Sequence, residues 1–348
     1  MELLDKITID RHAPQPKYRQ LVDSISENIS VGNFQLNAKL PSINKLSEQF
    51  MLSRDTVEKA YKVLKDKRII ISVKGKGFYI SSTPLDSQLK VLFLLNKLSA
   101  YKMRMYHSFL AAVGPEFHVD LQVYHCDEGL FLDILKKNQK TYDHYVIMPH
   151  FANARQRHTS ATEPVLNAMR RIPDNKLIIL DNYLEALAEN HAGVYQDFEN
   201  DLYEALKMSR EKIARYQKFV ITFPSRSVYP YPKRIVRGFN RFCVEAKIQF
   251  QVIEEIEEHM TLEPGTLYLT IPETDLVNLV KAARDQGFTL GEDIGVISYN
   301  ETPLKDLLGI TTVSTDFDEM GRLAADLLRQ RGKEKTKNRF VFTDRNSH

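Results

Sequence analysis

The 348-residue chain is too long for one small domain and suits two or three, and its 43% hydrophobic content is enough to form a sizeable core. The two cysteines, Cys126 and Cys243, lie far apart and outside any CxxC pair, which argues against a disulfide framework or a Cys-based zinc site and agrees with a reducing compartment. No run approaches the ~18 apolar residues of a membrane span, and the first residues lack the apolar core of a signal peptide, so we expect a cytoplasmic protein.

The net charge of +3 is unevenly distributed along the chain. Residues 1–80 hold fourteen Lys and Arg against nine Asp and Glu, whereas the remaining residues hold thirty-four against thirty-six. A basic excess confined to one segment is the expected footprint of a domain that binds a polyanion such as DNA.

The first predicted element is a helix over residues 17–31. Pro16 suits a helix start, and Gly32 suits the left-handed position that follows a last helical turn. The apolar residues expected on its buried face are Leu21, Val22, Ile25 and Ile29. We expect this helix to pack behind the elements that follow it.

Two short helices are predicted next, each preceded by a serine. Ser42 and Ser53 are placed to cap them by accepting a hydrogen bond from a free N–H group. After Ser53 the apolar residues recur at i, i+3, i+4 and i+7, which predicts one buried stripe formed by Val57, Ala60, Tyr61 and Leu64.

A basic hairpin ends this segment. Ile69, Ile71 and Val73 alternate as in a strand, and Gly75 and Gly77 permit the positive φ angles of a tight turn. Helix, turn, helix and basic hairpin together are the layout of a winged helix-turn-helix, which reads DNA. A lysine-rich helix or a KGKG turn taken alone is a solvated surface as often as it is a contact with DNA. The prediction therefore depends on the order and spacing of all four parts. The candidate DNA-binding residues are Ser42, Lys45, Ser53, Arg54, Thr56, Lys59, Lys74, Gly75 and Lys76.

Residues 16–80 resemble the N-terminal domain of the GntR family of bacterial transcriptional regulators. The resemblance rests on PKYRQLVDSISENISVGNF, LPSINKLSEQF, LSRDTVEKAYKVL and KGKGFYI, in that order. It implies contacts with phosphates and bases from the start of the second helix, the start of the recognition helix and the wing. Those roles fall here on Ser42, Ser53, Arg54, Thr56 and Gly75. Asn44 and Glu58 stand where the family often has Arg.

The polar segment at 81–88 is predicted to be a linker. From residue 89 onward, predicted strands and helices alternate. Strands are predicted at 91–95, 119–124, 145–148, 177–180, 219–223, 250–253, 266–271 and 294–299. Helices are predicted at 103–113, 130–138, 164–172, 198–216, 233–246, 274–286 and 316–331. This alternation indicates an α/β domain with parallel sheets, and the number of strands indicates two lobes with a ligand cleft at the strand ends.

Residues 267–331 carry a second resemblance, to the sugar-sensing domains of the lactose/ribose-repressor family, which share the fold of periplasmic sugar-binding proteins. GEDIGVISYNE and ITTVSTDFDEMG carry it, with fainter matches at KVLFLLNK, YDHYVIMP, KLIILDN, VYQDF and IVRGF. A GntR head on such a domain resembles the arabinose-repressor type of regulator. The expected architecture is a winged helix-turn-helix head at 1–80, a linker at 81–88 and a two-lobed α/β effector domain at 89–348. Lobe 1 is expected at about 89–194 and 316–331, and lobe 2 at about 195–315.

Residues at predicted strand ends are the candidates for effector binding. By the resemblance, Asn300 takes the place of a ligand-binding Asp, Asp181 a second acidic position and Phe317 an aromatic lining position. Asn96 and His150 follow other strands, and Tyr231 lies in a loop expected to reach the site. Arg234 is the seventh candidate, because Ile235 occupies the position where the family commonly has a sugar-reading Arg. For each lone Asn, Asp or His, the alternative is a hydrogen-bonded loop residue.

No catalytic motif is recognisable. The chain lacks a G-x-S-x-G elbow, a Walker A loop and an HExxH motif, and its histidines show no metal-ligand spacing. We therefore expect no enzymatic activity, cofactor or metal. Two alternatives remain: a sugar-binding receptor without a DNA role, and a GntR head fused to a pyridoxal-phosphate enzyme-like domain.

The sequence as a whole predicts a sugar-responsive transcriptional regulator, with a repressor of a carbohydrate-utilisation operon as the favoured type. We expect it to bind double-stranded operator DNA as a homodimer. The expected effector is a neutral monosaccharide, a pentose or a deoxyhexose such as arabinose or fucose, a choice that rests on family analogy.

Overall fold

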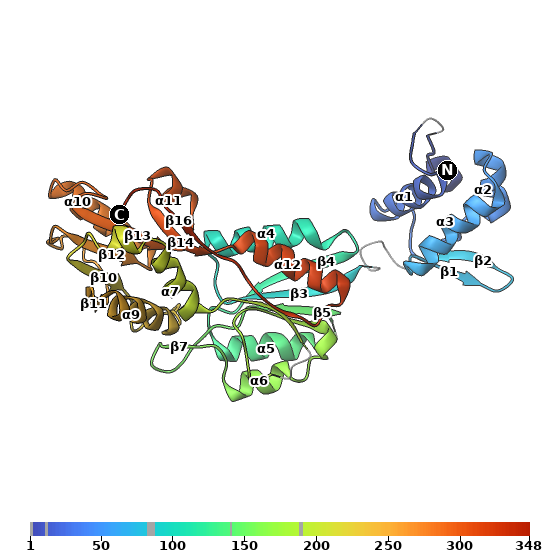
Figure 1. The fold of residues 1–348 in the computed structure, drawn as a ribbon. Helices are drawn as coiled ribbons and strands as arrows, with labels where there is room; N and C mark the ends of the chain where they lie inside the picture. Colours follow the sequence, from blue (N-terminus) through green and yellow to red (C-terminus); the bar gives the residue numbers. More distant parts are fainter. Residues whose placement is uncertain (1–2, 11–12, 82–87, 140, 188–190) are drawn as a thin grey trace. The chain divides into compact units, whose positions relative to one another are not determined.

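The computed structural model describes the whole chain except residues 1–2, 11–12, 82–87, 140 and 188–190 (Figure 1). It divides into two compact units, residues 1–89 with 115–118, and residues 90–114 with 119–348. The predicted fold class, a helix-turn-helix head and an α/β domain built on two sheets, is confirmed. Most of the expected linker at 81–88 lies outside the described residues.

The first unit is the winged helix-turn-helix that the sequence predicts. Its elements are η1 (Leu3–Lys6), α1 (Lys17–Ser30), α2 (Ile43–Phe50), α3 (Arg54–Asp66), β1 (Ile70–Val73) and β2 (Gly77–Ile80). The α1 helix ends before Gly32, whose φ of 75° is the left-handed conformation expected there. The predicted stripe of α3 packs against α1 in one core that includes Leu21, Ile25 and Leu46.

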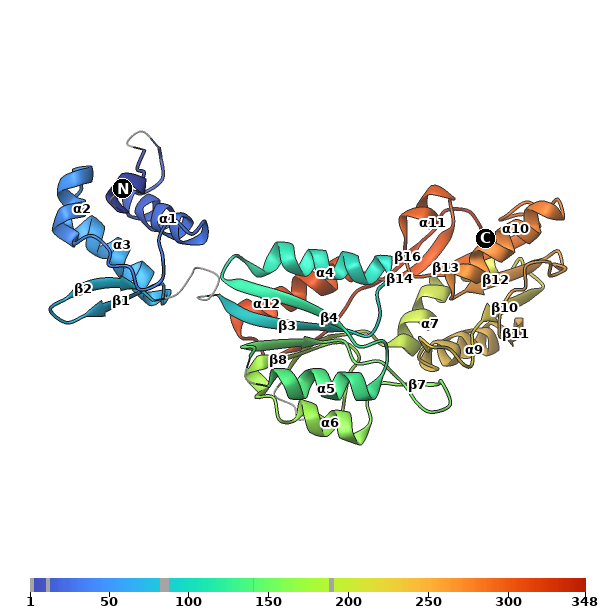
Figure 2. The same ribbon diagram turned by 180° about the vertical axis from the view of Figure 1, so that it is seen from behind.

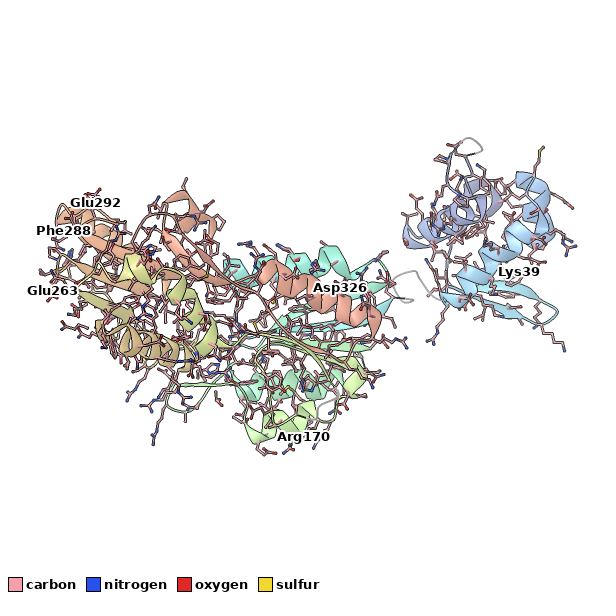
Figure 3. The ribbon with its side chains drawn as sticks, viewed as in Figure 1. Lys39, Arg170, Glu263, Phe288, Glu292 and Asp326 are labelled. Atoms are coloured by element: carbon pink, nitrogen blue, oxygen red, sulfur yellow. The ribbon has the colours of Figure 1, made fainter. Side chains whose placement is uncertain are left out.

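The pattern of buried isoleucines in the hairpin differs from the predicted alternation. Ile69 and Ile70 are both buried, whereas Ile71 is 49% exposed, so the predicted alternation of Ile69, Ile71 and Val73 is wrong. The reason is that Ile69 lies in the turn that follows α3, where its N–H donates to the Leu64 carbonyl at 2.9 Å, and the strand begins one residue later. Lys39 (Figure 3) forms an isolated bridge with Tyr79 beside the hairpin.

The larger unit contains two six-stranded sheets. The first has the order β15-β9-β8-β5-β3-β4, and β3, β5, β8 and β9 pair in parallel. Its strands are β3 (Leu89–Leu95), β4 (Phe117–Val123), β5 (His144–Ile147), β8 (Leu177–Asp181), β9 (Ala192–Tyr195) and β15 (Lys335–Lys337). The helices of this lobe are α4 (Ala100–Val113), α5 (Glu128–Asn138), α6 (Glu163–Met169) and α12 (Phe317–Gln330). A small hairpin, β6 (Phe151–Ala152) and β7 (His158–Thr159), and the turn η2 (Asp174–Lys176) complete it.

The second sheet has the order β11-β10-β12-β13-β14-β16, parallel except for the antiparallel edge strand β16 (Figure 2). Its strands are β10 (Lys218–Thr222), β11 (Gln249–Ile253), β12 (Thr266–Thr270), β13 (Ile294–Tyr299), β14 (Thr311–Thr315) and β16 (Phe340–Thr343). Its helices are α7 (Phe198–Met208), α8 (Arg210–Ile213), α9 (Arg234–Ala246), α10 (Glu273–Asp285) and α11 (Pro303–Leu307).

One predicted helix is divided in two. The sequence predicts a continuous helix over 198–216, but α7 ends at Met208 and α8 begins at Arg210. The break lies at Ser209, whose buried hydroxyl is hydrogen-bonded to the ring of His348, 2.5 Å away. This tertiary contact, between residues 139 positions apart, has no local signal.

The chain crosses between the two sheets three times, and the crossings lie side by side. They follow β9, β14 and β15. The Asn338 N–H donates to the Tyr195 carbonyl at 2.6 Å, and the Asp316 N–H donates to the Arg339 carbonyl at 2.9 Å. Three short connections held together in this way can act as a hinge between two lobes.

Candidate functional sites

A cleft lies where the parallel strands of both sheets end. Asn96 follows β3, Asp181 ends β8, Asn300 follows β13 and Phe317 follows β14. Strand carboxyl ends and helix N-termini are the usual position of ligand sites in α/β folds. The space between the lining atoms is about 430 Å³, including the part that opens to solvent. The lining residues are Asn96, Lys97, Tyr101, Lys102, His150, Asp181, Gln196, Phe198, Pro230, Tyr231, Pro232, Ile235, Tyr299, Asn300 and Phe317.

Six of the seven candidate effector residues line this one cleft. They are Asn96, His150, Asp181, Tyr231, Asn300 and Phe317. The seventh, Arg234, is not among the lining residues, and its guanidinium carbon lies 5.5 Å from the centre of the Phe198 ring. Its neighbour on α9, Ile235, faces the cleft instead, because adjacent helical residues point in directions about 100° apart.

Asp181 is held by a chain of hydrogen bonds. His150 Nε2 lies 2.6 Å from Asp181 Oδ2, and His150 Nδ1 lies 2.7 Å from His158 Nε2. Gln196 donates to the other Asp181 oxygen and accepts from the Thr315 hydroxyl at 2.7 Å. Both ring nitrogens of His150 are therefore engaged, so His150 orients the carboxylate of Asp181 and has no nitrogen left for a ligand.

The protonation states follow from these contacts. Burial lowers the pKa of His150 and outweighs the opposing effect of Asp181, so its imidazole is neutral at pH 7. Burial and the neighbouring His150 lower the pKa of His158 to about 2. Burial alone would raise the pKa of Asp181, but its hydrogen bond with His150 and nearby Lys102 hold that pKa below its usual value. Asp181 is consequently a carboxylate, and it can accept hydrogen bonds from a ligand hydroxyl.

The backbone at two of these positions is unusual. Asp181 and Asn300 have φ angles of 71° and 66°, a left-handed conformation that non-glycine residues rarely adopt. Residues held in such energetically unfavourable backbone conformations are concentrated at functional sites. The N–H of Asn300 donates to the Val313 carbonyl at 2.8 Å, and the Lys305 ammonium donates to the Asn300 carbonyl at 2.8 Å.

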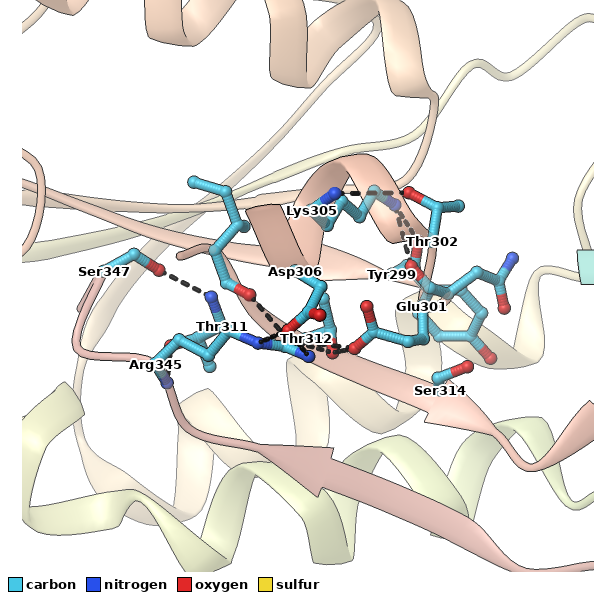
Figure 4. A network of polar contacts seen from close by, with 12 residues as sticks. Tyr299, Glu301, Thr302, Lys305, Asp306, Thr311, Thr312, Ser314, Arg345 and Ser347 are labelled. Atoms are coloured by element: carbon cyan, nitrogen blue, oxygen red, sulfur yellow. Dashed lines mark hydrogen bonds and ion pairs between the residues drawn. The ribbon is translucent and has the colours of Figure 1, made fainter. Parts of the chain in front are cut away.

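The support of Asn300 continues into a polar network behind the strand end (Figure 4). Lys305 also donates to the Tyr299 carbonyl at 2.8 Å, and burial lowers its pKa to about 8. Arg345 joins the same region by ion pairs of 2.9 Å with both Glu301 and Asp306 (Figure 4). The strand end is thus fixed from behind by charged groups that do not line the cleft.

Aromatic rings form much of the rest of the lining. The rings of Tyr101 and Phe317 lie 4.8 Å apart at an angle of 33°. Burial raises the pKa of Tyr101 to about 12, while hydrogen bonds with Ser99 and Asn300 oppose the shift. Ring faces beside a few oriented polar groups suit the C–H surfaces and hydroxyls of a carbohydrate.

Five polar lining residues are not among the sequence-predicted candidates: Lys97, Tyr101, Lys102, Gln196 and Tyr299. Gln196 lies in VYQDF, which matches the repressor family only faintly, but its position after a strand could have identified it. Tyr101 and Lys102 lie in the first turn of α4, a helix whose apolar pattern predicts only packing, and Lys97 lies just before it. Lys102 is 4% exposed, and no local pattern marks a lysine that is buried.

The candidate DNA-binding residues lie on the surface of the first unit. Eight are exposed and Thr56 is half-buried. Ser42 and Ser53 cap α2 and α3 as expected, their hydroxyls accepting from the N–H groups of Lys45 and Thr56 at 3.2 Å. Arg54 is the first residue of α3, and Lys74, Gly75 and Lys76 form the tip of the hairpin.

The position of Lys59 favours a partly structural role. Its ammonium lies 4.2 Å from the centre of the Tyr18 ring, a cation–π contact between α3 and α1. The ammonium therefore contributes to packing within the head, whether or not it also touches a phosphate.

Two family models match the chain, one in each unit. Residues 17–80 match the family described as bacterial regulatory proteins, gntR family, and residues 211–344 match a periplasmic binding protein-like domain. The chain is 27% identical over 121 residues to the HTH-type transcriptional repressor YtrA of Bacillus subtilis, covering 32% of this chain and 93% of YtrA. It is 30% identical over 86 residues to the repressor NagR of the same organism, a match that covers 25% of this chain and only 35% of NagR.

Solved structures resemble the larger unit in fold. The trehalose repressor from Escherichia coli superposes with a TM-score of 0.59 at 17% identity, covering 74% of this chain and 100% of the repressor chain. A LacI-family transcriptional regulator from Lactobacillus casei with bound glucose gives a TM-score of 0.57 at 12% identity, covering 74% and 99% of the two chains. At these identities the likeness concerns the fold alone.

Two other kinds of feature are absent from the described residues. Outside the undescribed gaps, no helix has the length and apolar character needed to span a membrane. Within the same residues, no group of three or more His, Cys, Asp and Glu side chains is arranged to hold a metal ion. The matches and the fold together describe a chain with an N-terminal helix-turn-helix domain that matches the gntR family model, followed by a domain with the periplasmic-binding-protein-like fold.

Proposed function

We propose that this protein is a carbohydrate-responsive transcriptional regulator, a repressor that binds operator DNA as a homodimer through two winged heads. The observation that carries the proposal is the cleft, where six of the seven candidate effector residues converge from both sheets beside three hydrogen-bonded crossings. A ligand that contacts both lobes favours their closed arrangement. Operator affinity then changes by the difference in ligand affinity between the two states, typically about 1–3 kcal/mol.

The chemistry of the cleft supports a carbohydrate as the effector. Asp181, Asn300 and Tyr101 offer a carboxylate, an amide and a hydroxyl, which together donate and accept as sugar hydroxyls require. The rings of Tyr101 and Phe317 offer apolar faces. A pentose or deoxyhexose skeleton, as the family resemblance implies, is our starting point. The pyridoxal-phosphate alternative is set aside, because the domain has a binding-protein fold rather than that of an aminotransferase.

The test couples ligand binding to operator binding. A carbohydrate panel screened by thermal shift identifies a ligand, and the protein is then titrated with operator DNA with and without it. The same titrations use Asn300→Ala and Asn300→Gly. Both variants remove the amide, but only glycine adopts the observed φ of 66° without strain.

We expect both variants to lose roughly ten- to a hundredfold in ligand affinity, because a ligand hydroxyl is left unpaired at a cost of about 1–3 kcal/mol. Operator binding without ligand should stay nearly unchanged. A wild-type protein whose operator affinity is the same with and without its bound sugar would contradict the proposed function.

A further inference from the structure

The cleft holds more positive charge than its carboxylates balance. Lys97 and Lys102 both line the cleft. Neither ammonium group forms an ion pair with any described residue. Asp181 is the one carboxylate among the lining residues, and each of its oxygens already accepts a hydrogen bond, from His150 and Gln196.

Lys102 is unusual because it is buried with so few partners. It is 4% exposed, and among the described residues its ammonium donates to the side-chain oxygen of Asn96 alone, although an ammonium has three protons to donate. Burial lowers the pKa of Lys102 to about 8, while the more distant charge of Asp181 opposes the shift. Burying a charge with a single neutral acceptor costs free energy, so a role in packing alone would be served better by an apolar side chain.

Lys97 adds a second cation to the lining of the cleft. Its ammonium lies 5.1 Å from the centre of the Tyr231 ring and 5.5 Å from that of Tyr229. Ring faces hold a cation in place without neutralising it. Lys97 is half-exposed, so its charge is available to a molecule that enters from solvent.

A helix N-terminus and a tyrosine hydroxyl at the cleft also favour the binding of an anion. The 13-residue helix α9 begins at Arg234 with no side-chain cap on its N–H groups, and Pro232 and Ile235 at that end line the cleft. The N-terminus of a helix carries partial positive charge and free donors. Tyr299 also lines the cleft, and its buried hydroxyl has no hydrogen-bond partner among the described residues.

We propose that the effector is an anionic carbohydrate, a sugar carrying a carboxylate or a phosphate, whose oxyanion binds between Lys102 and Lys97. The proposal rests on the proposed function and replaces the neutral character expected from family analogy, while the sugar skeleton keeps its contacts with Asn300 and the aromatic rings. The oxyanion supplies the acceptors that Lys102 lacks and balances the charge of both ammonium groups.

The test compares matched compounds on the full-length protein. Calorimetry measures affinity for neutral arabinose, glucose and fucose, for the corresponding sugar acids arabinonate, glucuronate and fuconate, and for arabinose 5-phosphate and glucose 6-phosphate. At least one acid or phosphate should bind about tenfold or more tightly than its neutral parent. The carboxylate and phosphate arms show which oxyanion the cleft accepts.

Variants then locate the oxyanion. Lys102→Met and Lys97→Met should each reduce the preference for the anionic compound by about tenfold, whereas Lys102→Arg, which keeps the charge, should retain most of it. Lys281→Met, on an exposed lysine of α10 paired with Glu258, is the matched control and should leave the preference unchanged.

The outcomes separate this inference from the proposed function. Neutral parents that bind as tightly as the acids and phosphates, no binding by any anionic compound, or a preference that survives in Lys102→Met would each overturn the inference. A neutral sugar that binds and shifts operator affinity leaves the proposed function intact without the anionic effector. An anionic sugar that binds through Lys102 without changing operator affinity supports the inference and contradicts the regulatory function.

Discussion

Lys305 donates a 2.8 Å hydrogen bond to the main-chain carbonyl of Asn300, so a buried charge holds the candidate ligand residue from behind. The same ammonium bonds the Tyr299 carbonyl, and the two bonds fix the chain where it turns into its left-handed conformation. The position of Asn300 is therefore set by a residue that does not line the cleft.

Lys305→Met should loosen this turn. The substitution removes a buried ammonium but leaves two carbonyls without their donor, and each unsatisfied buried group costs about 1–3 kcal/mol. We expect a net loss of roughly 1–3 kcal/mol in the free energy of unfolding, measured by urea denaturation, and weaker effector binding by calorimetry. Stability and affinity both equal to wild type would show that Lys305 does not support Asn300. Lys207→Met, at an exposed surface pair with Glu204, is the control and should change stability by less than about 0.5 kcal/mol.

Arg54 should carry sequence information in the DNA complex. It is exposed at the first position of α3, where a recognition helix presents side chains to base edges. Arg54→Ala should weaken operator binding by about 1–3 kcal/mol and affect random DNA much less. Fluorescence anisotropy on both DNAs measures the difference, with Lys65→Ala at the last turn of the same helix as control. An equal loss on random DNA would make Arg54 a phosphate contact instead.

The ends of the buried strands could be predicted from the sequence, because a continuous apolar run followed by a polar residue marks where such a strand stops. That signal alone indicates that Asn96, Asp181 and Asn300 lie at strand ends, and the cleft brings the three together. The buried Lys102 could not be predicted in this way. A lysine near a helix start is predicted to be solvated. Its burial depends on residues distant in sequence that cover it.

The parts of the fold that local patterns do not predict have tertiary causes. Edge strands β15 and β16 are short and follow the last helix, where local pattern is weak, and they form only because β9 and β14 present free edges. Ser209, where the predicted helix breaks, is hydrogen-bonded to the distant His348. Local periodicity identifies elements with their own buried face, whereas these features take their stability from residues distant in sequence.

The wing should contribute affinity without sequence preference. Lys74 and Lys76 flank Gly75 at the exposed hairpin tip, where ammonium groups can reach the phosphate backbone. Replacing both with Gln should reduce the slope of log affinity against log salt by roughly one to two, because each phosphate contact releases about one counterion. Titrations across a salt series measure the slope on operator and on random DNA. An unchanged slope would place the wing away from the backbone.

His150 and His158 should make the protein sensitive to mild acid. In the folded state the pKa of His158 is lowered to about 2 by burial and His150, and burial lowers the pKa of His150 as well. Unfolded histidines have a pKa of about 6.5, so below that pH the unfolded state binds more protons than the folded state. The free energy of unfolding therefore falls as pH decreases, by up to about 2 kcal/mol per such histidine between pH 7 and pH 5.

His158→Gln should remove the part of this pH dependence that is due to His158. A glutamine amide retains a donor toward His150 but does not titrate, so the variant should lose less stability than wild type between pH 7 and pH 5. Urea denaturation at half-unit pH steps measures the difference, and His259→Gln, at an exposed position, is the control. Parallel curves for wild type and His158→Gln would show that His158 does not stay neutral in the folded protein. Because the same hydrogen-bond chain ends on Asp181, effector affinity should also fall over this pH range in wild type, and less in His158→Gln.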